Sequence, residues 1–158
     1  MYQNAHDAYL DSRILTADPL ELVTILYQAG ITSVRDARRH LANRDIAARS
    51  KSITKAWGIL AELTHSLDRK RGGEISERLA ELYDYMMRRL MEANFQQADA
   101  PLAEVLGLLA TLLEGWQGIQ ASAKQAVQQA PASSSTSPWG NAMPQQEAAV
   151  YSSQAWSF

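Results

Sequence analysis

Glu62 and His65 are the first residues whose types and spacing could do chemistry. They form an E-x-x-H pair, and a spacing of three places both side chains on one face of a helix. Carboxylate-bridged di-iron sites in helical bundles use two such pairs and two further glutamates. The other histidines are His6 and His40, and neither follows a glutamate at this offset. The sequence therefore predicts no metal site, and we interpret the pair as part of a solvated helix surface.

Other catalytic patterns are weak or absent. Tyr83, Asp84 and Tyr85 carry acid–base groups, but adjacent residues of a helix face different directions and do not form one site. The chain has no phosphate-binding glycine loop and no G-x-S-x-G nucleophile elbow. It also has no cysteine, which excludes thiol catalysis and disulfides. We therefore expect no enzyme activity, no catalytic residue and no cofactor.

A basic run at residues 35–44, "RDARRHLANR", could neutralise a few phosphates of a nucleic acid. Asp36 interrupts this run, no aromatic residue lies within it, and the whole chain has a net charge of −2. These features are typical of a solvated helix end, so we expect no nucleic-acid partner.

The composition of the 158 residues indicates the compartment. The first residues, "MYQNAHDAYLDSR", lack the basic and apolar regions of a signal peptide. No run of about 18 apolar residues occurs, which argues against stable membrane insertion. We expect a soluble, cytoplasmic protein.

Apolar residues recur at steps of three and four through most of the chain, which predicts helices and no strands. Asp18 is an N-cap residue, Pro19 suits the first helical position, and Glu21 completes a capping box. The paired glycines at 72–73 are interpreted as the stop signal of the second helix. The predicted helices are residues 18–42, 45–70, 74–96 and 99–129. The expected fold class is all-α, an antiparallel up-down four-helix bundle over residues 18–130.

The bundle is expected to lie between two segments of a different kind. Residues 1–17 form a short N-terminal segment, and residues 131–158 form a low-complexity tail that we expect to be mostly disordered. The tail nevertheless carries aromatic residues, which a simple spacer does not require. One hypothesis is that they dock on the bundle and compete with a partner. These residues are Trp139, Tyr151, Trp156 and Phe158.

The predicted helices carry more apolar residues than one core stripe needs. In the first helix, a row through Val23 and Leu26 runs beside a second apolar row through Leu22 and Ile25. The second helix adds Trp57 and Ile59 to its stripe, and the third adds Tyr83, Met87 and Met91. Three explanations stay open from the pattern alone: a first helix covered on several sides, a homodimer interface, or a groove for a partner helix.

The string "GGEISERLAELYDYMMRRLMEAN" at residues 72–94 resembles the signature region of FliS, the family of flagellar secretion chaperones. Two further strings resemble the N-terminal part and the last helix of that family, "TADPLELVTILYQAG" and "AEVLGLLATLLEGWQGI". The ordered set extends from residue 1 to about residue 120.

This resemblance implies a helical bundle that binds the disordered C-terminal segment of flagellin and prevents premature polymerisation. It also implies delivery of flagellin to a component of the export gate of the flagellar type III apparatus, without catalysis or cofactor. The alternative is a structural bundle that uses its extra apolar surface to form a homodimer and binds no client peptide.

The resemblance also implies where the partner-binding residues lie. Tyr9 and Ile14 belong to the N-terminal segment 1–17, which is expected to cover part of the binding surface as a removable cap. The remaining residues are expected to line apolar grooves for the flagellin helices. These are Leu22, Ile25, Leu26, Ile59, Leu63, Tyr83, Met87 and Leu90.

Overall fold

The computed structural model describes residues 19–129. By its internal contacts the chain divides into two units, residues 1–121 and residues 122–158. The described part of the second unit is residues 122–129, which are exposed and form the end of the last helix. The predicted cap Asp18, the N-terminal segment 1–17 and the tail 131–158 lie outside the described residues.

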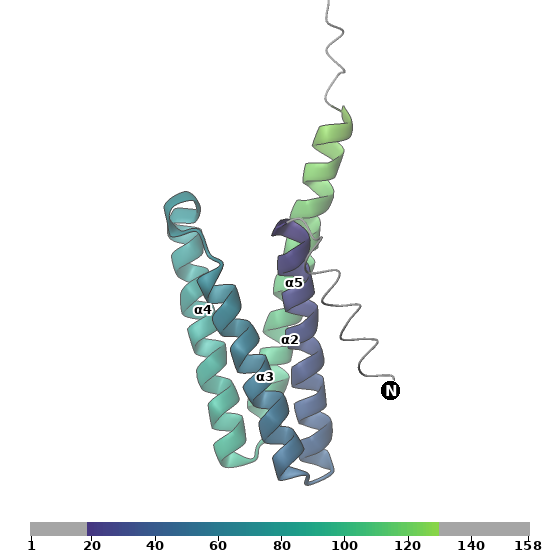
Figure 1. The fold of residues 1–158 in the computed structure, drawn as a ribbon, viewed down its shortest axis with the longest axis vertical. Coiled ribbons are helices and arrows are strands. Elements are labelled where there is room, and N and C mark those ends of the chain that lie inside the picture. Colours follow the sequence, from purple (N-terminus) through teal and green to yellow (C-terminus); the bar gives the residue numbers. More distant parts are fainter. Residues whose placement is uncertain (1–18, 130–158) are drawn as a thin grey trace, which may run out of the picture. The chain divides into compact units, whose positions relative to one another are not determined.

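Residues 19–129 form helices joined by short connections, and they contain no strand. Successive helices run in opposite directions (Figure 1), which confirms the predicted all-α antiparallel bundle. The helices are α2 (Pro19–Ala42), α3 (Ile46–His65), α4 (Arg69–Gln96) and α5 (Asp99–Gln129).

Aspartate caps begin two of the helices. The Asp45 carboxylate accepts a hydrogen bond of 2.9 Å from the backbone N–H of Ala48 at the start of α3, close to the predicted start at residue 45. Asp68 does the same for α4, because its carboxylate accepts from the backbone N–H groups of Lys70 and Arg71. A side-chain acceptor at the N-cap satisfies donors that have no partner within the helix.

The predicted boundary between the second and third helices is wrong for the end of the second helix, but a break does occur at the glycine pair. The sequence places it at the paired glycines, but α3 ends at His65 and α4 begins at Arg69. Gly73 interrupts α4 with φ 49° and ψ −129°, a conformation that only glycine adopts readily. A Cβ at Gly72 would lie 1.7 Å from Ser76 Oγ, whose hydroxyl donates to the Asp68 carbonyl. The glycines therefore break the helical conformation of α4 just before Glu74, where the sequence predicts the third helix to begin, and Asp68 caps the short helical piece that precedes them.

The core of the bundle is built from all four helices. Its centre contains Tyr27 of α2 and Tyr83 of α4, whose hydroxyl groups lie 2.5 Å apart. Aliphatic side chains fill the space around this pair. The largest of them that are fully buried are Ile53, Leu60, Leu63, Met86, Leu90, Leu102, Leu109, Val34 and Val105.

Polar contacts hold α5 against its neighbours. Arg38 of α2 donates to both carboxylate oxygens of Asp99, at 2.7 and 2.8 Å. Further along α5, Arg89 of α4 forms an ion pair with Glu104 at 2.6 Å. The Trp116 indole N–H then donates to the Leu20 carbonyl at 3.1 Å. Because these contacts are spaced along α5, they fix its register on α2 and α4.

Candidate partner-binding surface

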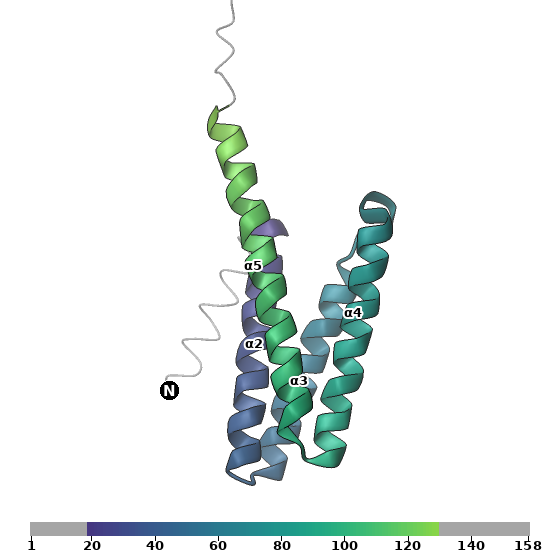
Figure 2. The same cartoon turned by 180° about the vertical axis from the view of Figure 1, so that it is seen from behind.

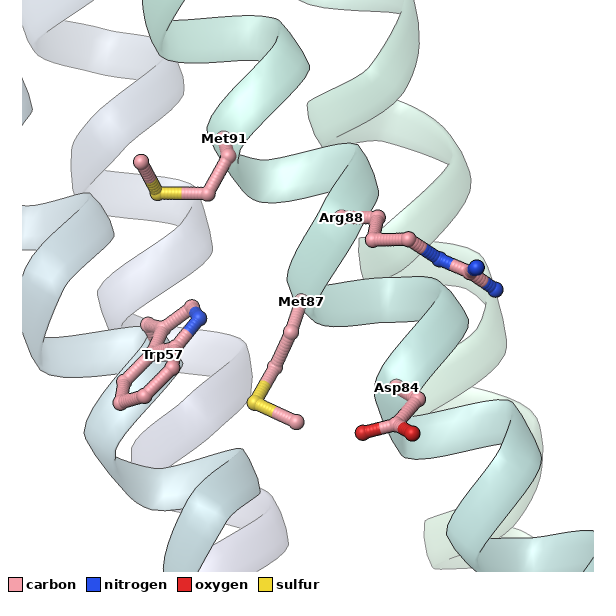
Figure 3. A pocket seen from close by; sticks show the side chains of 5 residues that line it. All are labelled: Trp57, Asp84, Met87, Arg88 and Met91. Atoms are coloured by element: carbon pink, nitrogen blue, oxygen red, sulfur yellow. The ribbon is translucent and has the colours of Figure 1, made fainter.

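Helices α3 and α4 form a shallow groove of about 370 Å³, which we call the α3–α4 groove. Trp57 of α3 faces Met87 of α4 across it, and Met91 stands one turn further along (Figure 3). Asp84 and Arg88 also line the groove from α4. They lie on the side of Met87 that is away from Trp57 (Figure 3). The groove therefore combines an apolar floor with one charge of each sign.

The apolar residues of this groove are open to solvent. Trp57 is 43% exposed and Met91 is 55% exposed, whereas Met87 is partly buried and packs against the core. An unbranched thioether adapts its shape to different partners, and an indole ring offers a large rigid surface. The α3–α4 groove thus has the chemistry of a site that binds apolar side chains of a polypeptide.

A second apolar region lies at the end of the bundle where α2 begins and α3 ends. The α3–α4 pair and the α2–α5 pair move apart toward this end (Figures 1 and 2). Apolar side chains from all four helices pack on the core there but are only partly buried. We call them the half-buried cluster: Val23, Leu26, Ile59, Leu67, Leu79, Leu82, Leu112, Leu113 and Trp116.

Four of the predicted partner-binding residues are core residues. They are Ile25, which is 6% exposed, and Leu63, Tyr83 and Leu90, which are at most 1% exposed. In this conformation these four side chains present almost no surface to a partner.

Four other predicted residues keep accessible surface. Leu26 of α2 and Ile59 of α3 belong to the half-buried cluster. Leu22, one turn before Leu26 on α2, is partly exposed. Met87 lines the α3–α4 groove. The structure thus divides the predicted helix residues among the core, the half-buried cluster and the α3–α4 groove, and it leaves Leu22 partly exposed outside these three groups. Tyr9 and Ile14 lie outside the described residues.

Trp57 and Met91 were not among the predicted partner-binding residues, although the pattern already marked both as surplus apolar residues. The signal that could have selected them is their position off the apolar stripe of their own helix. Trp57 and Met91 are exposed as this position suggests, but the position alone does not decide exposure, because Tyr83 also lies off the stripe and is 1% exposed. The predicted partner-binding residues instead include Leu63 and Leu90, which lie on the stripes of their helices and are buried.

A hydrogen-bonded network ties α4 to α5 at the edge of the bundle. The Tyr85 hydroxyl donates to the Glu104 carboxylate, which also accepts from the Arg89 guanidinium. The bond from Tyr85, helped by Arg89, lowers the pKa of Glu104. The same bond raises the pKa of Tyr85. Both shifts favour the protonation states that make the network, so α5 is held in place near neutral pH.

The buried hydroxyls of Tyr27 and Tyr83 are likewise in the protonation state that their hydrogen bond requires. Burial is the main cause that raises the pKa of Tyr83, and the bond to Tyr27 adds to it. Burial also raises the pKa of Tyr27. Both hydroxyls therefore stay neutral and act as a structural link rather than as an acid–base pair.

No three His, Asp or Glu side chains within residues 19–129 lie close enough together to hold a metal ion. The E-x-x-H pair, Glu62 and His65, is exposed on the last turns of α3. In the basic run, Arg38 pairs with Asp99, and Arg39 pairs with Asp36. Within residues 19–129, these charged side chains therefore lie exposed on the helices or in ion pairs.

Among the described helices, α5 is long and apolar enough to cross a membrane by length and composition. It places Leu102, Val105 and Leu109 in the bundle core. A core helix meets the same criterion as a membrane span, so length and composition do not distinguish the two. The expectation of no stable membrane insertion stays a prediction.

The comparison with protein families gives a direct result. The model of the family described as "Flagellar protein FliS" matches residues 1–123. This chain belongs to the FliS family. The match includes every described helix except the last residues of α5, and it leaves residues 124–158 outside.

Individual FliS proteins agree with this result. The flagellar secretion chaperone FliS of Salmonella typhimurium is 36% identical over 115 residues, which cover 72% of this chain and 85% of that protein. The FliS of Bacillus subtilis is 35% identical over 123 residues, covering 77% of this chain and 91% of that protein. The flagellar secretion chaperone FliSB of Pseudomonas aeruginosa is 36% identical over 110 residues, covering 70% and 87%.

The string that resembles the FliS signature, residues 72–94, has both structural and surface roles. Tyr83 and Met86 are core residues, whereas Asp84 and Met87 line the α3–α4 groove. Asn94, at the end of the string, accepts hydrogen bonds from α3. The FliS signature therefore supplies both the core residues of α4 and the residues with which α4 lines the α3–α4 groove.

Proposed function

We propose that this member of the FliS family is a cytoplasmic, non-catalytic export chaperone. Its client is the disordered C-terminal segment of flagellin, which it keeps from polymerising too early and delivers to a component of the flagellar type III export gate. The observation that carries this proposal is the accessible apolar surface of the bundle, namely the open α3–α4 groove and the partly buried side chains of the half-buried cluster.

The physical argument starts from the cost of ordering a disordered segment. Each residue that adopts one conformation loses entropy worth about 1–2 kcal/mol, and this loss must be offset by burial of apolar area. A single pocket does not supply enough area for a segment of many residues. Apolar side chains spread over four helices can do so, because each turn of the client meets another apolar position.

The shape of the α3–α4 groove supports a helical client. Trp57 stands on the α3 wall, and Met87 and Met91 stand one turn apart on the α4 wall (Figure 3). An amphipathic helix places anchors at steps of three and four, so successive anchors could contact Met87 and Met91, which are also four residues apart. Asp84 and Arg88 would then meet polar residues at the edge of that helix.

We propose that the client contacts the accessible members of the predicted set, together with two residues that the structure adds. The accessible members are Leu22, Leu26, Ile59 and Met87, and the added residues are Trp57 and Met91. We assign the buried members a supporting role, in which they hold the walls of the surface in place. The supporting residues are Ile25, Leu63, Tyr83 and Leu90.

The experiment that tests this function is calorimetric titration of the purified chain with flagellin from the same organism, either complete or without its C-terminal segment. We expect binding to complete flagellin and loss of binding after truncation. Absence of binding to both forms would contradict the proposal. Light scattering of the chain alone then tests the alternative, in which the apolar surface forms a homodimer without a client.

Matched variants locate the surface. Trp57→Glu places a charge in the α3–α4 groove at an exposed position, so the bundle should still fold. We expect about a tenfold or greater loss of affinity, as for central aromatic residues of interfaces. Val127→Ala, at a position that is 78% exposed outside both apolar regions, is the control and should bind as the wild type does. Equal affinities of the two variants would remove the groove from the client site.

A further inference from the structure

Arg49 of α3 is a buried cation at the end of the bundle opposite to the half-buried cluster. Its residue is 3% exposed, and it lines a hollow of about 470 Å³ beside the connections α2–α3 and α4–α5. The other residues that line this hollow are Leu41, Arg44, Ile46, Gln97 and Asp99. Charged side chains are seldom buried to this extent without an opposite charge, so Arg49 needs an explanation.

The contacts of the Arg49 guanidinium are with neutral oxygens. Its Nε donates to Asn94 Oδ1 at 3.3 Å, one Nη donates to Gln97 Oε1 at 3.4 Å, and the other donates to the Asn94 carbonyl at 3.5 Å. These distances are long for hydrogen bonds of a charged donor, which are usually about 2.7–2.9 Å. Within residues 19–129 no carboxylate lies within 4 Å of the guanidinium nitrogens.

Asp99, which lines the hollow, and Asp45, which precedes α3, already have partners. Asp99 lines the same hollow, but both of its carboxylate oxygens accept hydrogen bonds from Arg38. Asp45 caps α3 through its bond to the Ala48 N–H. The C-terminal end of α4 offers Arg49 only a partial negative charge through the Asn94 carbonyl. The guanidinium therefore lacks a full counter-charge in the described part of the chain.

The surroundings of Arg49 favour an anion with an apolar neighbour. Arg44 lines the same hollow and forms no ion pair among the described residues. Leu41 and Ile46 supply an apolar wall, and Ile46 is 57% exposed. A guanidinium fork matches the two oxygens of a carboxylate, so a bound carboxylate would replace long contacts of Arg49 with shorter charge-assisted hydrogen bonds.

We propose that this hollow, which we call the Arg49 pocket, binds a carboxylate group of the client polypeptide. This inference rests on the proposed chaperone function and deepens it, because the pocket would fix one point of the client at a place separate from the apolar surface. The carboxylate comes either from the chain terminus of the client or from an Asp or Glu side chain. Both sources present the same pair of oxygens to Arg49.

The first test is calorimetric titration of the full chain with a synthetic peptide of the flagellin C-terminal segment, at low and at physiological ionic strength. We expect Arg49→Gln to bind about tenfold more weakly, and Arg44→Gln about two- to threefold more weakly, because a buried charge-assisted bond contributes more than an exposed charge. Arg49→Lys keeps the charge without the fork and should lie between wild type and Arg49→Gln. Arg35→Gln, at an exposed arginine of α2 that does not line the pocket, is the control.

A second peptide distinguishes the two sources of the carboxylate. If the chain terminus occupies the pocket, a peptide with an amidated C-terminus should bind the wild type about tenfold more weakly and should lose no further affinity with Arg49→Gln. If a side chain occupies it, amidation should leave the affinity unchanged and the loss with Arg49→Gln should remain. Equal affinities of the wild type, Arg49→Gln and Arg44→Gln for the free-acid peptide would overturn the proposal.

An independent test uses acetate alone. The Nε–H resonance of Arg49 in the wild-type chain should shift with added acetate and not with chloride at the same ionic strength. If the wild type does not bind the peptide at all, the chaperone function fails, and this resonance alone decides whether the pocket binds carboxylates. A shift combined with an unchanged peptide affinity of Arg49→Gln would mean a site for free anions, which would contradict the client assignment. If Arg49→Gln does not fold, as judged by circular dichroism, Arg44→Gln and the resonance carry the test.

Discussion

The hydroxyl groups of Tyr27 and Tyr83 lie 2.5 Å apart in the core and link α2 to α4. Both residues are at most 2% exposed, so water does not replace this bond if one hydroxyl is removed. The bond places a polar contact in the middle of an otherwise apolar core, and a polar contact there specifies one arrangement of the helices.

The losses of stability from removing each hydroxyl alone should add up to more than the loss from removing both. Tyr27→Phe or Tyr83→Phe leaves a buried hydroxyl without a partner, at a cost of about 1–3 kcal/mol in the free energy of unfolding. The double variant should lose less than the sum of the two single variants. Urea unfolding of the four proteins measures this double-mutant cycle. Additive losses would show that the two hydroxyls do not interact.

The kink in α4 should depend on glycine. Gly73 has φ 49° and ψ −129°, so Gly73→Ala should lower the stability by about 1–3 kcal/mol. Gly115→Ala on α5 is the matched control, because a Cβ there would meet no atom within 4 Å. The control should be stabilising by about 0.5–1 kcal/mol, since alanine favours a helix over glycine. Thermal unfolding of both variants checks the difference, and similar melting temperatures would contradict it.

Gly30 of α2 should tolerate a methyl group but no larger side chain. A Cβ there would lie 3.4 Å from Leu109 Cδ1 and 3.5 Å from Ile59 Cγ2, which are ordinary contact distances. Gly30→Ala should therefore leave the stability unchanged or raise it by about 0.5–1 kcal/mol. Gly30→Leu should force α3 and α5 apart and cost about 1–3 kcal/mol. Denaturant unfolding distinguishes these outcomes, and a tolerated leucine would mean that the three helices pack less closely here.

Acid should weaken the link between α4 and α5 through Glu104. Its pKa in the folded chain lies below the ordinary value of 4.5, so its contribution to stability is present above 4.5 and is lost as the pH falls through the lowered pKa. At neutral pH the wild type should be more stable than Glu104→Gln, and this difference should disappear in acid. Urea unfolding across this pH range measures it. Glu77→Gln, at an exposed position of α4 outside this network, is the control for the loss of a surface carboxylate.

Local sequence signals predicted most of the helical framework. α3 begins at Ile46, one residue from the predicted start, and α5 begins at Asp99 as predicted. These features depend on a few neighbouring residues, so they can be read without the fold. The boundary at 65–69 could not be predicted in the same way. Two start signals lie there, the Asp68 cap and the glycine pair. Which of them begins the helix depends on how Ser76 packs against Asp68 in the folded chain.

The division of apolar residues between core and surface came only from the tertiary structure. Ile25 and Leu26 are adjacent apolar residues on α2, yet the first is buried and the second is only partly buried. When two neighbouring rows of one helix are both apolar, the helical period does not say which row faces the other helices. The same holds for Leu90, which is buried, and Met91, which is 55% exposed.

The sequence by itself determined that this chain forms helices, where most of them begin, and that it resembles FliS. These conclusions follow from spacing and from short motifs, which act over a few residues. Only the tertiary structure decided which apolar residues form the α3–α4 groove and that Arg49 is buried without a carboxylate partner in the described residues. Both depend on which side chains from separate helices meet, and contacts between residues far apart in the chain leave no periodic signal in the sequence.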